Sequence, residues 1–342
     1  MAEPWAALRP GPDFLDILDQ RVLPLTQRYL HCQSGDDVVE AISTLAVRGA
    51  PLIGLVSIYG LWLYALAADP EDMSKVLAAG ADKLKRARPT AVNLAWAVDR
   101  AMAAVAAEDS RSVAAILFDL AEVVKIEDRE QNLRIGNYGA DFFSRPVSLL
   151  THCNTGSLAT AGYGTALGVI RTLHRRGQLK QVYVDETRPL FQGARLTAWE
   201  LQQDSIAATV IPDSAAAFLI SRGLVDAVVV GADRVAANGD SANKIGTLML
   251  AIVAHHYGLP FVVAAPWTTV DLSLSRGDQI PIEERSETEV AEVLGHRILP
   301  EGVAAYNPAF DVTPASLITV IVTDRGAVRA PFAESLFRLK SN

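Results

Sequence analysis

The second half of the chain alternates short apolar runs with stretches of helical periodicity, and this rhythm restricts the possible folds more than any other feature. From residue 146 onwards the runs are rich in Val, Ile and Leu along their whole length. Strands of that kind are buried on both faces, as in parallel sheets covered by helices. We therefore expect an α/β domain in which a parallel sheet is flanked by helices. The expected strands are 147–153, 181–184, 207–211, 227–230, 260–265 and 317–322, and the expected helices are 157–171, 194–204, 214–222 and 244–257.

The first half has a different character, because its apolar residues recur with helical spacing between polar breaks. A chain of 342 residues also exceeds the usual size of a single hydrophobic core. We expect two domains: a mainly helical one over 1–145 and a sheet domain with the catalytic groups over 146–342, connected by a long helix near 111–135. The other expected elements are helices at 36–47, 52–67, 73–87 and 91–107 and two short strands within 15–29.

The stretch Ala50–Ala68 contains no charged residue and is about long enough to span a bilayer. It also contains Pro51 and two glycines, and acidic residues rather than a basic loop follow it. We therefore expect a helix that is buried on all sides, in the core or in a dimer interface, and no membrane span.

The charge balance and the cysteine content exclude several classes of protein. Asp and Glu outnumber Lys and Arg by 39 to 31, and no basic stripe or arm is present, so nucleic acid is not an expected partner. Cys32 and Cys153 are the two cysteines and lie far apart, which fits no disulfide framework and suits a reducing compartment. The first residues lack the basic and apolar regions of a secretory signal, and we expect a cytoplasmic protein.

Polar residues gather directly after the expected strands, at the edge where open α/β sheets bind their ligands. Cys153 ends the first strand, and a polar turn separates it from the helix expected at 157–171. The N–H groups and the dipole at a helix N-terminus favour anions, so this place suits a thiolate or a bound phosphate. The alternative is that the cysteine is a small buried hydrophobic residue.

Asp233 follows the apolar run 228–230 and is expected deep at a strand end, under apolar cover. Desolvation raises the pKa of such a carboxyl group, which fits a proton donor. The alternative is an aspartate that caps the turn at 238–240. Asp185 and Gln192, which follow the second strand, are weaker candidates.

Several groups suited to anion binding lie beside turns. Asn243 and Lys244 are expected to open the helix 244–257, where an ammonium group beside unpaired N–H groups holds phosphate or a sugar hydroxyl. Arg48 and Arg88 each stand next to a turn, as an arginine clamp on phosphate requires. Taken singly, an arginine is more often a solvated surface charge.

The sequence contains no sign of a cofactor or metal site. The glycine-rich segment 162–168 lacks the G-x-G-x-x-G spacing and falls inside the expected helix, so we interpret it as a packing segment. No Walker loop, His-Glu-x-x-His motif or paired Cys-x-x-Cys motif is present. We expect neither nucleotide nor metal.

The segments around these candidates resemble the methylthioribose-1-phosphate isomerase family. The similarity runs in order from about Leu15 to Pro314 and covers most of the chain. Ribose-1,5-bisphosphate isomerase and regulatory subunits of the translation-initiation exchange factor, from the same superfamily, are similar more loosely. The segments that carry the resemblance are Arg48–Pro51, Arg88–Leu94, Thr151–Asn154, Asp185–Pro189, Gln192–Leu201, Gly231–Asp240, Asn243–Thr247, Ile280–Arg285 and Tyr306–Pro314.

The resemblance implies a helical N-terminal domain, a Rossmann-like C-terminal domain and a homodimer that needs no cofactor. It implies an aldose–ketose isomerase that converts 5-methylthio-α-D-ribose 1-phosphate to 5-methylthio-D-ribulose 1-phosphate in methionine salvage. The family's catalytic cysteine falls on Cys153, and its acid/base aspartate falls on Asp233. Its substrate-binding positions fall on Arg48, Gly49, Ala50, Arg88, Gln192, Asn243 and Lys244.

Trp267 departs from the family pattern, in which we expect a small polar residue. A bulky ring beside the substrate leaves open whether the 5-substituent is methylthio or a smaller group, as in 5-deoxyribose 1-phosphate. Ribose 1,5-bisphosphate would require an additional cationic group at the distal end. A third hypothesis is a regulatory subunit that only binds a sugar phosphate, but such a subunit needs neither Cys153 nor Asp233.

Overall fold

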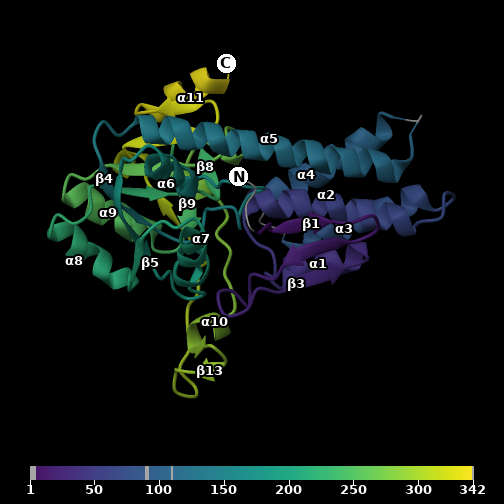
Figure 1. Ribbon diagram of the computed structural model, residues 1–342, viewed down its shortest axis with the longest axis horizontal. Helices are drawn as coiled ribbons and strands as arrows, with labels where there is room; N and C mark the ends of the chain where they lie inside the picture. Colours follow the sequence, from purple (N-terminus) through teal and green to yellow (C-terminus); the bar gives the residue numbers. More distant parts are fainter. Residues whose placement is uncertain (1–4, 89–91, 109–110, 341–342) are drawn as a thin grey trace. The chain divides into compact units, whose positions relative to one another are not determined.

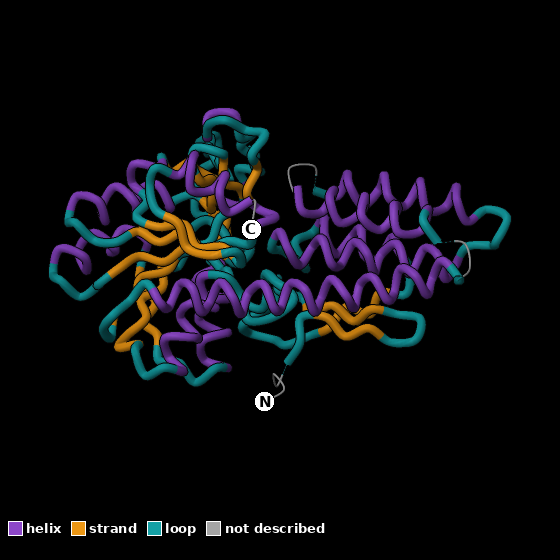
Figure 2. Tube along the Cα trace, turned by 90° about the horizontal axis from the view of Figure 1, so that it is seen from above, coloured by secondary structure: helices purple, strands orange, loops and turns teal. Residues whose placement is uncertain are grey.

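The computed structural model describes residues 5–88, 92–108 and 111–340, and the chain divides into two compact units (Figures 1 and 2). The first unit comprises Met1–Gln131 and Gly156–Gly164, and the second comprises Asn132–Thr155 and Thr165–Asn342. Residues 1–4, which begin the segment expected to lack a secretory signal, lie outside the described residues. So do residues 89–91, which belong to the segment Arg88–Leu94 and to the start of an expected helix.

This division differs from the expected boundary between residues 145 and 146 in two respects. The first boundary between the units falls within the helix α5 (Val113–Asp141). The first part of α5 packs in the core of the first unit, and its last part packs in the core of the second. The segment Gly156–Gly164 folds with the first unit, although it follows the first strand of the second. Neither place coincides with a change of composition, so periodicity does not locate them.

The first unit combines helices with a small antiparallel sheet. β2 lies within the region 15–29 where two strands are expected, and β3 begins at its end, whereas β1 is not expected from the sequence. The observed helices agree with the expected ones to within a few residues. The elements are β1 (Leu8–Pro10), β2 (Leu15–Leu18), β3 (Tyr29–Cys32), α1 (Gly35–Ser43), α2 (Ala50–Ala67), α3 (Met73–Ala87) and α4 (Val92–Ala106).

The uncharged helix α2 forms the centre of the first unit. Among the described residues it is the one helix long and apolar enough to cross a membrane, and 72% of it is buried inside the protein. It packs against α1, α3 and α4, with buried side chains around most of its circumference. A helix that is covered on several sides needs no polar face, which explains its composition.

The segment Gly156–Gly164 is held on the first unit by backbone and side-chain contacts. The Leu52 N–H donates to the Ala159 carbonyl at 3.2 Å, and Gln20 Nε2 donates to the Leu158 carbonyl at 2.7 Å. Gly49, at the N-terminus of α2, has a φ of +98°, and a Cβ atom there would lie 2.4 Å from Ala159 Cα. The close approach of two backbones therefore requires glycine at position 49.

The second unit is built on a seven-stranded sheet with the strand order β16-β15-β10-β7-β4-β5-β6. All neighbouring pairs are parallel except β15 with β16. The chain runs outward from β4 to β6 on one side and from β7 to β15 on the other, so the order reverses between β4 and β7. Ligands of such doubly wound sheets bind at the carboxyl ends of the strands beside this reversal. The strands are β4 (Val147–Thr151), β5 (Leu179–Asp185), β6 (Ala208–Ile211), β7 (Ala227–Val230), β10 (Phe261–Ala264), β15 (Val320–Thr323) and β16 (Gly326–Val328).

Helices cover both faces of this sheet, as the sequence predicts (Figure 1). In β7, residues 227 and 229 pack into one core, and residues 228 and 230 pack into the other. The strands are apolar along their whole length because each successive side chain meets a helix layer. One face carries the end of α5, α6 (Ala166–Arg175) and α7 (Ala198–Gln203), and the other carries α8 (Ala216–Ser221), α9 (Thr247–His256) and α11 (Phe332–Lys340).

The helix after β4 begins later than predicted. The apolar pattern predicts 157–171, whereas α6 begins at Ala166. Residues 162–164 have positive φ angles of 145°, 68° and 79°, which a right-handed helix cannot contain, so the chain turns there. The glycine-rich segment therefore begins in the turn before α6, and the prediction of a helix N-terminus directly after Cys153 is wrong.

A four-stranded sheet with the order β11-β8-β9-β14 is not expected from periodicity. Asn243 and Lys244 lie at the end of β9, so the prediction that they open a helix is wrong. Strands of two to four residues are too short for their periodicity to be distinguished from a loop. The strands are β8 (Arg234–Ala236), β9 (Ser241–Lys244), β11 (Val270–Asp271) and β14 (Phe310–Thr313), and the smaller elements of the unit are α10 (Thr288–Ala291), β12 (Glu292–Val293) and β13 (His296–Arg297).

Candidate functional site

Cys153 lies two residues beyond β4, at the carboxyl edge where the strand order reverses. Its φ is +62°, a left-handed conformation that costs a non-glycine residue about 1–2 kcal/mol. Two hydroxyl groups hold this turn. Thr187 Oγ1 accepts from the Cys153 N–H at 2.9 Å, and Thr197 Oγ1 donates to the Cys153 carbonyl at 2.6 Å. These two hydrogen bonds connect the Cys153 backbone to two other segments and thereby fix the position of its buried thiol.

A buried ionic network supports the same turn through Asn154. Asn154 Nδ2 donates to Glu200 Oε1 at 2.8 Å and to Thr197 Oγ1 at 3.2 Å. Glu200 Oε2 in turn accepts from Arg171 Nη2 at 2.9 Å, and Arg171 also pairs with Asp204 at 2.6 Å. Because Glu200 is fully buried, Arg171 and Asn154 together compensate its charge and fix its position.

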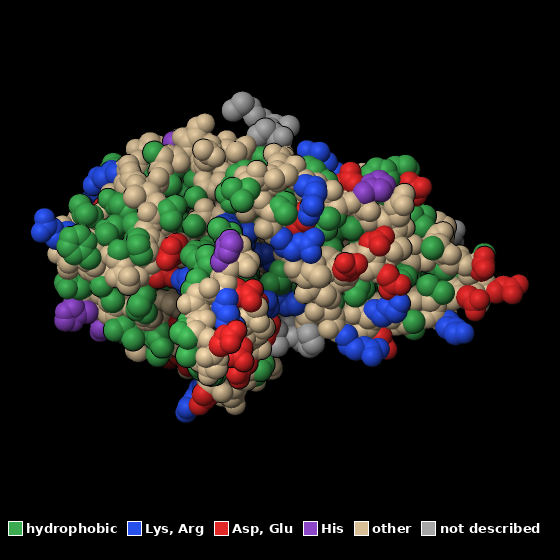
Figure 3. Space-filling model, turned by 90° about the horizontal axis from the view of Figure 1, so that it is seen from below, with side chains coloured by type: hydrophobic (Ala, Val, Ile, Leu, Met, Phe, Trp, Pro, Cys, Tyr) green, Lys and Arg blue, Asp and Glu red, His purple; other side chains and the backbone are tan. Residues whose placement is uncertain are grey.

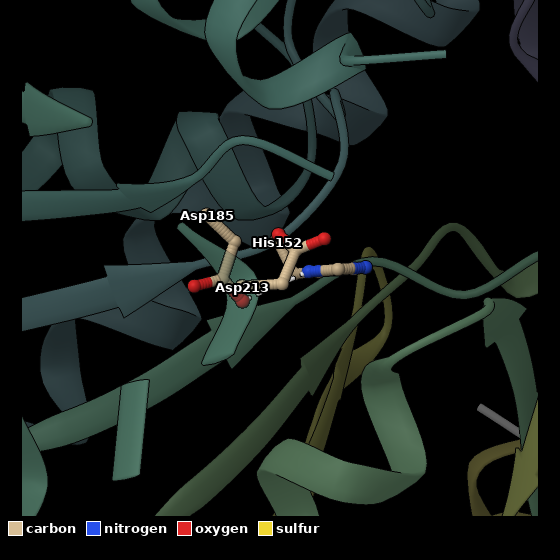
Figure 4. A group of neighbouring side chains, drawn as sticks. All are labelled: His152, Asp185 and Asp213. Carbon is tan, nitrogen blue, oxygen red and sulfur yellow. Dashed lines mark hydrogen bonds and ion pairs between the residues drawn. The ribbon is translucent and has the colours of Figure 1, made fainter. Parts of the chain in front are cut away.

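A cluster formed by the buried His152 and Asp185 and the half-buried Asp213 lies at the same strand ends (Figure 4). His152 Nδ1 contacts Asp185 Oδ2 at 2.9 Å, and His152 Nε2 contacts the Ile245 carbonyl at 2.8 Å. Burial raises the pKa of Asp185 to about 6, although the hydrogen bond from His152 opposes this. His152 is not among the site residues predicted from the sequence, and its position directly before Cys153 is the signal that indicates it.

The three side chains offer a histidine nitrogen and carboxylate oxygens within 4.8 Å of one another, which is the chemistry of a metal-binding group. Both ring nitrogens of His152, however, already contact protein oxygens. Both carboxylate oxygens of Asp213 accept backbone N–H groups, from Thr187 and Arg188, at 2.7 Å. Most polar atoms of the cluster are therefore hydrogen-bonded within the protein, but Asp185 Oδ1 is buried with no hydrogen-bond partner among the described residues.

Asp233 does not have the apolar cover that the sequence predicts. It follows β7 by three residues, and its side chain is exposed. Its N–H donates to the Ala242 carbonyl at 2.9 Å, which places its backbone at the start of the β8–β9 pair rather than within the large sheet. The apolar run 228–230 ends before the chain leaves the sheet, so apolar neighbours in sequence do not bury the aspartate.

Three predicted binding residues lie in the second unit. Gln192 is buried at the start of the π-helical turn Gly193–Thr197, and its Oε1 atom has no hydrogen-bond partner among the described residues. Asn243 is buried, and its Nδ2 donates to Thr247 Oγ1 at 2.9 Å. The ammonium group of Lys244 lies 4.5 Å from the centre of the Phe310 ring. The second unit thus presents polar groups suited to sugar hydroxyls and phosphate.

The other predicted binding residues lie in the first unit. Arg48, Gly49 and Ala50 form the entry to α2, in which Gly49 is the N-cap and Ala50 the first residue. Arg88 directly follows α3 as its C-cap. Both arginines are half-buried, so neither is a fully solvated surface charge. On the face drawn in Figure 3, Lys and Arg side chains of the described residues are interspersed with Asp and Glu side chains.

The fold and the sequence together define a class of protein. The family model of the Initiation factor 2 subunit family matches residues 46–330, which include the sheet, the Cys153 turn and most of the first unit. Among solved structures, a translation initiation factor eIF-2B, subunit delta, from A. fulgidus is 37% identical, with a TM-score of 0.89 and coverage of 98% of this chain and 99% of that one.

More specific similarity comes from one subgroup of that class. The methylthioribose-1-phosphate isomerase of Pelotomaculum thermopropionicum is 50% identical over 332 residues, which cover 95% of this chain and 91% of the relative. The crystal structure of 5-methylthioribose 1-phosphate isomerase from Pyrococcus horikoshii OT3 is 43% identical, with a TM-score of 0.92 and coverage of 98% and 96%. The chain belongs to the methylthioribose-1-phosphate isomerase family.

Proposed function

We propose that this protein converts 5-methylthio-α-D-ribose 1-phosphate to 5-methylthio-D-ribulose 1-phosphate, a step of methionine salvage. The observation that supports this most is 50% identity, over 95% of the chain, to an isomerase named for that substrate. The held Cys153 turn, at the edge of the sheet where ligands bind, supports it independently.

The substrate carries phosphate on its anomeric oxygen, so its ring cannot open by loss of a hydroxyl proton. In the proposed reaction Asp233 donates a proton to the ring oxygen as the bond between C1 and that oxygen breaks. The hydrogen on C2 moves to C1, and the C2 hydroxyl loses its proton as the ketone forms. Cys153 acts as the base in this transfer or stabilises the developing charge. A sugar phosphate lying over the exposed Asp233 removes water from the carboxyl group, which favours its protonated form.

The binding roles follow from charge and from hydrogen-bonding capacity. We assign the phosphate to the guanidinium groups of Arg48 and Arg88 and to the N–H groups of Gly49 and Ala50 at the N-terminus of α2, an 18-residue helix. We assign the binding of the sugar to Gln192, Asn243 and Lys244. The buried Oε1 atom of Gln192, which has no hydrogen-bond partner in the part of the chain that the structure describes, suits a sugar hydroxyl that would satisfy it.

The assembly and location of the protein are part of the proposal. We propose a cytoplasmic homodimer that requires no cofactor and binds neither membranes nor nucleic acid. The net charge of −8 supports the last point. Light scattering during gel filtration tests the dimer, and a monomer at micromolar concentration would contradict it.

A second candidate function is a regulatory subunit that binds sugar phosphate without turning it over. The similarity to an initiation-factor subunit at 37% identity favours it. The presence of both Cys153 and Asp233 argues for catalysis, because binding alone requires neither a thiol nor an acid. A smaller 5-substituent is also retained as an alternative. Trp267 follows β10, and the Arg325 guanidinium carbon lies over its ring, 4.6 Å from the ring centre. This contact holds the bulky ring in place.

The test is turnover of three substrates by the purified protein: 5-methylthioribose 1-phosphate, 5-deoxyribose 1-phosphate and ribose 1,5-bisphosphate. We expect ketose phosphate from the first, detected by NMR. Preference for the second substrate would assign the smaller 5-substituent. Absence of product from all three, with binding retained, would support the regulatory subunit and refute the proposed enzyme.

The matched control for Cys153→Ser is Cys32→Ser, because these are the two cysteines of the chain. Cys32 is buried in β3 of the first unit, and burial raises the pKa of its thiol to about 12, which keeps it in the unreactive thiol form. We expect loss of turnover in Cys153→Ser and normal turnover in Cys32→Ser. Near-normal turnover by Cys153→Ser would exclude Cys153 from the chemistry. Turnover of C2-deuterated substrate in ordinary water then separates the two roles, since deuterium retained at C1 indicates direct transfer.

A further inference from the structure

The ring of His152 is fully buried, and both of its nitrogens face oxygen atoms. The Ile245 carbonyl can only accept a hydrogen bond, so Nε2 carries a proton. A second proton lies between Nδ1 and Asp185 Oδ2, because two acceptors do not approach to 2.9 Å without one. His152 and Asp185 therefore hold two protons together, and the pair as a whole is neutral.

The surrounding charges place the shared proton on the histidine. Two further carboxylates face His152: Asp213, which accepts two backbone N–H groups, and Asp311, which accepts the N–H groups of Gly246 and Leu248. Burial alone would lower the pKa of His152, but the hydrogen bond and charge of Asp185 and the charge of Asp213 raise it above its ordinary value. These carboxyl groups therefore favour the imidazolium form of the ring.

This ring joins three segments that carry the proposed site. His152 directly precedes Cys153, Asp185 ends β5, and Ile245 directly follows Lys244 at the end of β9. The contact with the last segment is close, because a Cβ atom on Gly246 would lie 2.9 Å from His152 Cε1. The Asp185 carbonyl also accepts from Thr187 Oγ1, the same hydroxyl that holds the Cys153 N–H.

We infer that His152 is a positioning residue: as an imidazolium ion held by Asp185, it sets the Cys153 turn and the Asn243–Lys244 strand end relative to each other. This inference rests on the proposed function, because it gives the ion a role in turnover. The contact with Asp185 orients the cysteine turn, which affects the chemical step. The contact with Ile245 orients the binding pair, which affects substrate affinity.

The charge state is tested without substrate, by ¹⁵N NMR of the histidine-labelled protein. At pH 8 we expect one imidazole with both nitrogens protonated, whose signals disappear in His152→Gln and persist in the control His174→Gln, an exposed histidine on α6. Asp185→Asn removes the counter-charge, and the ring should then be neutral at pH 8. A wild-type His152 with one unprotonated nitrogen at pH 8 would overturn the inference.

The positioning role is tested by two variants that each preserve one contact. The amide nitrogen of Gln occupies the place of Nε2 and keeps the Ile245 contact, whereas that of Asn occupies the place of Nδ1 and keeps the Asp185 contact. We expect kcat to fall on the order of 10- to 100-fold in His152→Gln with KM nearly unchanged. In His152→Asn we expect KM to rise about tenfold with kcat nearly unchanged. If His152 had a purely structural role, both variants would lose the same fraction of active enzyme, with no separation of the effects on kcat and KM. That result would refute the inference.

Failure of the proposed function gives a different pattern. If the wild-type protein turns over none of the three sugar phosphates, the isomerase proposal fails, while the NMR result still decides the charge of His152. The rate of Cys153 alkylation by iodoacetamide, measured in the Cys32→Ser background, then reports the geometry of the turn. We expect a change of about tenfold in His152→Gln and none in His174→Gln. An unchanged rate in both would refute the positioning role.

Discussion

Substitution of Gly49 by alanine should destabilise the first unit by two separable effects. The residue has a φ of +98° and a ψ of 126°, outside the left-handed helical region, and holding an alanine there costs about 1–3 kcal/mol relative to glycine. The new Cβ atom would also lie 2.4 Å from Ala159 Cα and 2.5 Å from the Ala159 carbonyl oxygen, both backbone atoms that cannot rotate away. Overpacking of this kind costs about 1–3 kcal/mol. The expected loss in the free energy of unfolding is therefore about 2–6 kcal/mol.

Gly162→Ala provides the matched control within the same unit. Its φ is +145°, but the nearest atom to a new Cβ is the flexible Arg129 side chain at 3.7 Å, an ordinary contact distance. Only the backbone effect applies, so we expect a loss of about 1–3 kcal/mol. Urea unfolding followed by tryptophan fluorescence measures both variants, since Trp62 is buried in the core of the first unit. Equal losses in Gly49→Ala and Gly162→Ala would show that Gly156–Gly164 does not pack on the entry to α2, and would refute the reasoning.

Further predictions concern buried charges. Arg171→Met leaves Glu200 fully buried without its cation and should reduce the free energy of unfolding by about 3–5 kcal/mol in urea titrations, whereas Arg86→Met, at an exposed pair, should change it by less than about 1 kcal/mol. Similar losses in both would contradict the compensating role of Arg171. Burial alone would raise the pKa of Asp19, but the hydrogen bonds from two arginines outweigh it and lower that pKa. The resulting stabilisation is present above about pH 4 and is lost as the pH falls through the pKa of the folded state, so the deficit of Asp19→Asn should be largest at pH 7 and shrink in acid. A deficit independent of pH between 2 and 7, in chemical unfolding, would contradict this assignment.

The parallel sheet and most helices could be predicted from the sequence because burial on two faces imposes a composition on each strand. The run 227–230 is apolar throughout, and it forms β7 with the predicted bounds. The helix α3 likewise has the predicted bounds, since its apolar residues recur with helical spacing. These patterns are local, so they can be recognised in the sequence without knowledge of the segments against which each element packs.

The candidate site was only partly predictable, because its environment is set by segments distant in sequence. The apolar run before Asp233 predicts burial, yet the chain leaves the sheet at that point and the side chain is exposed. The β-strand that contains Lys244 is defined by pairing with β14, about 70 residues away, as in the register of Asn243 with Asp311. The role of His152 is not predictable for the same reason, because its partners Asp185 and Ile245 meet it only in the folded chain.

The sequence by itself determined the class of fold, the family, and the positions of the cysteine and the aspartate to which catalysis is assigned. Its periodicity reports burial, and its motifs are contiguous residues whose order survives without the structure. Only the tertiary structure decided that Cys153 lies in a left-handed turn held by two threonines, and that the adjacent His152 is buried against Asp185. Those features depend on hydrogen bonds between segments 33 to 93 residues apart, and such contacts exist only once the strands have paired.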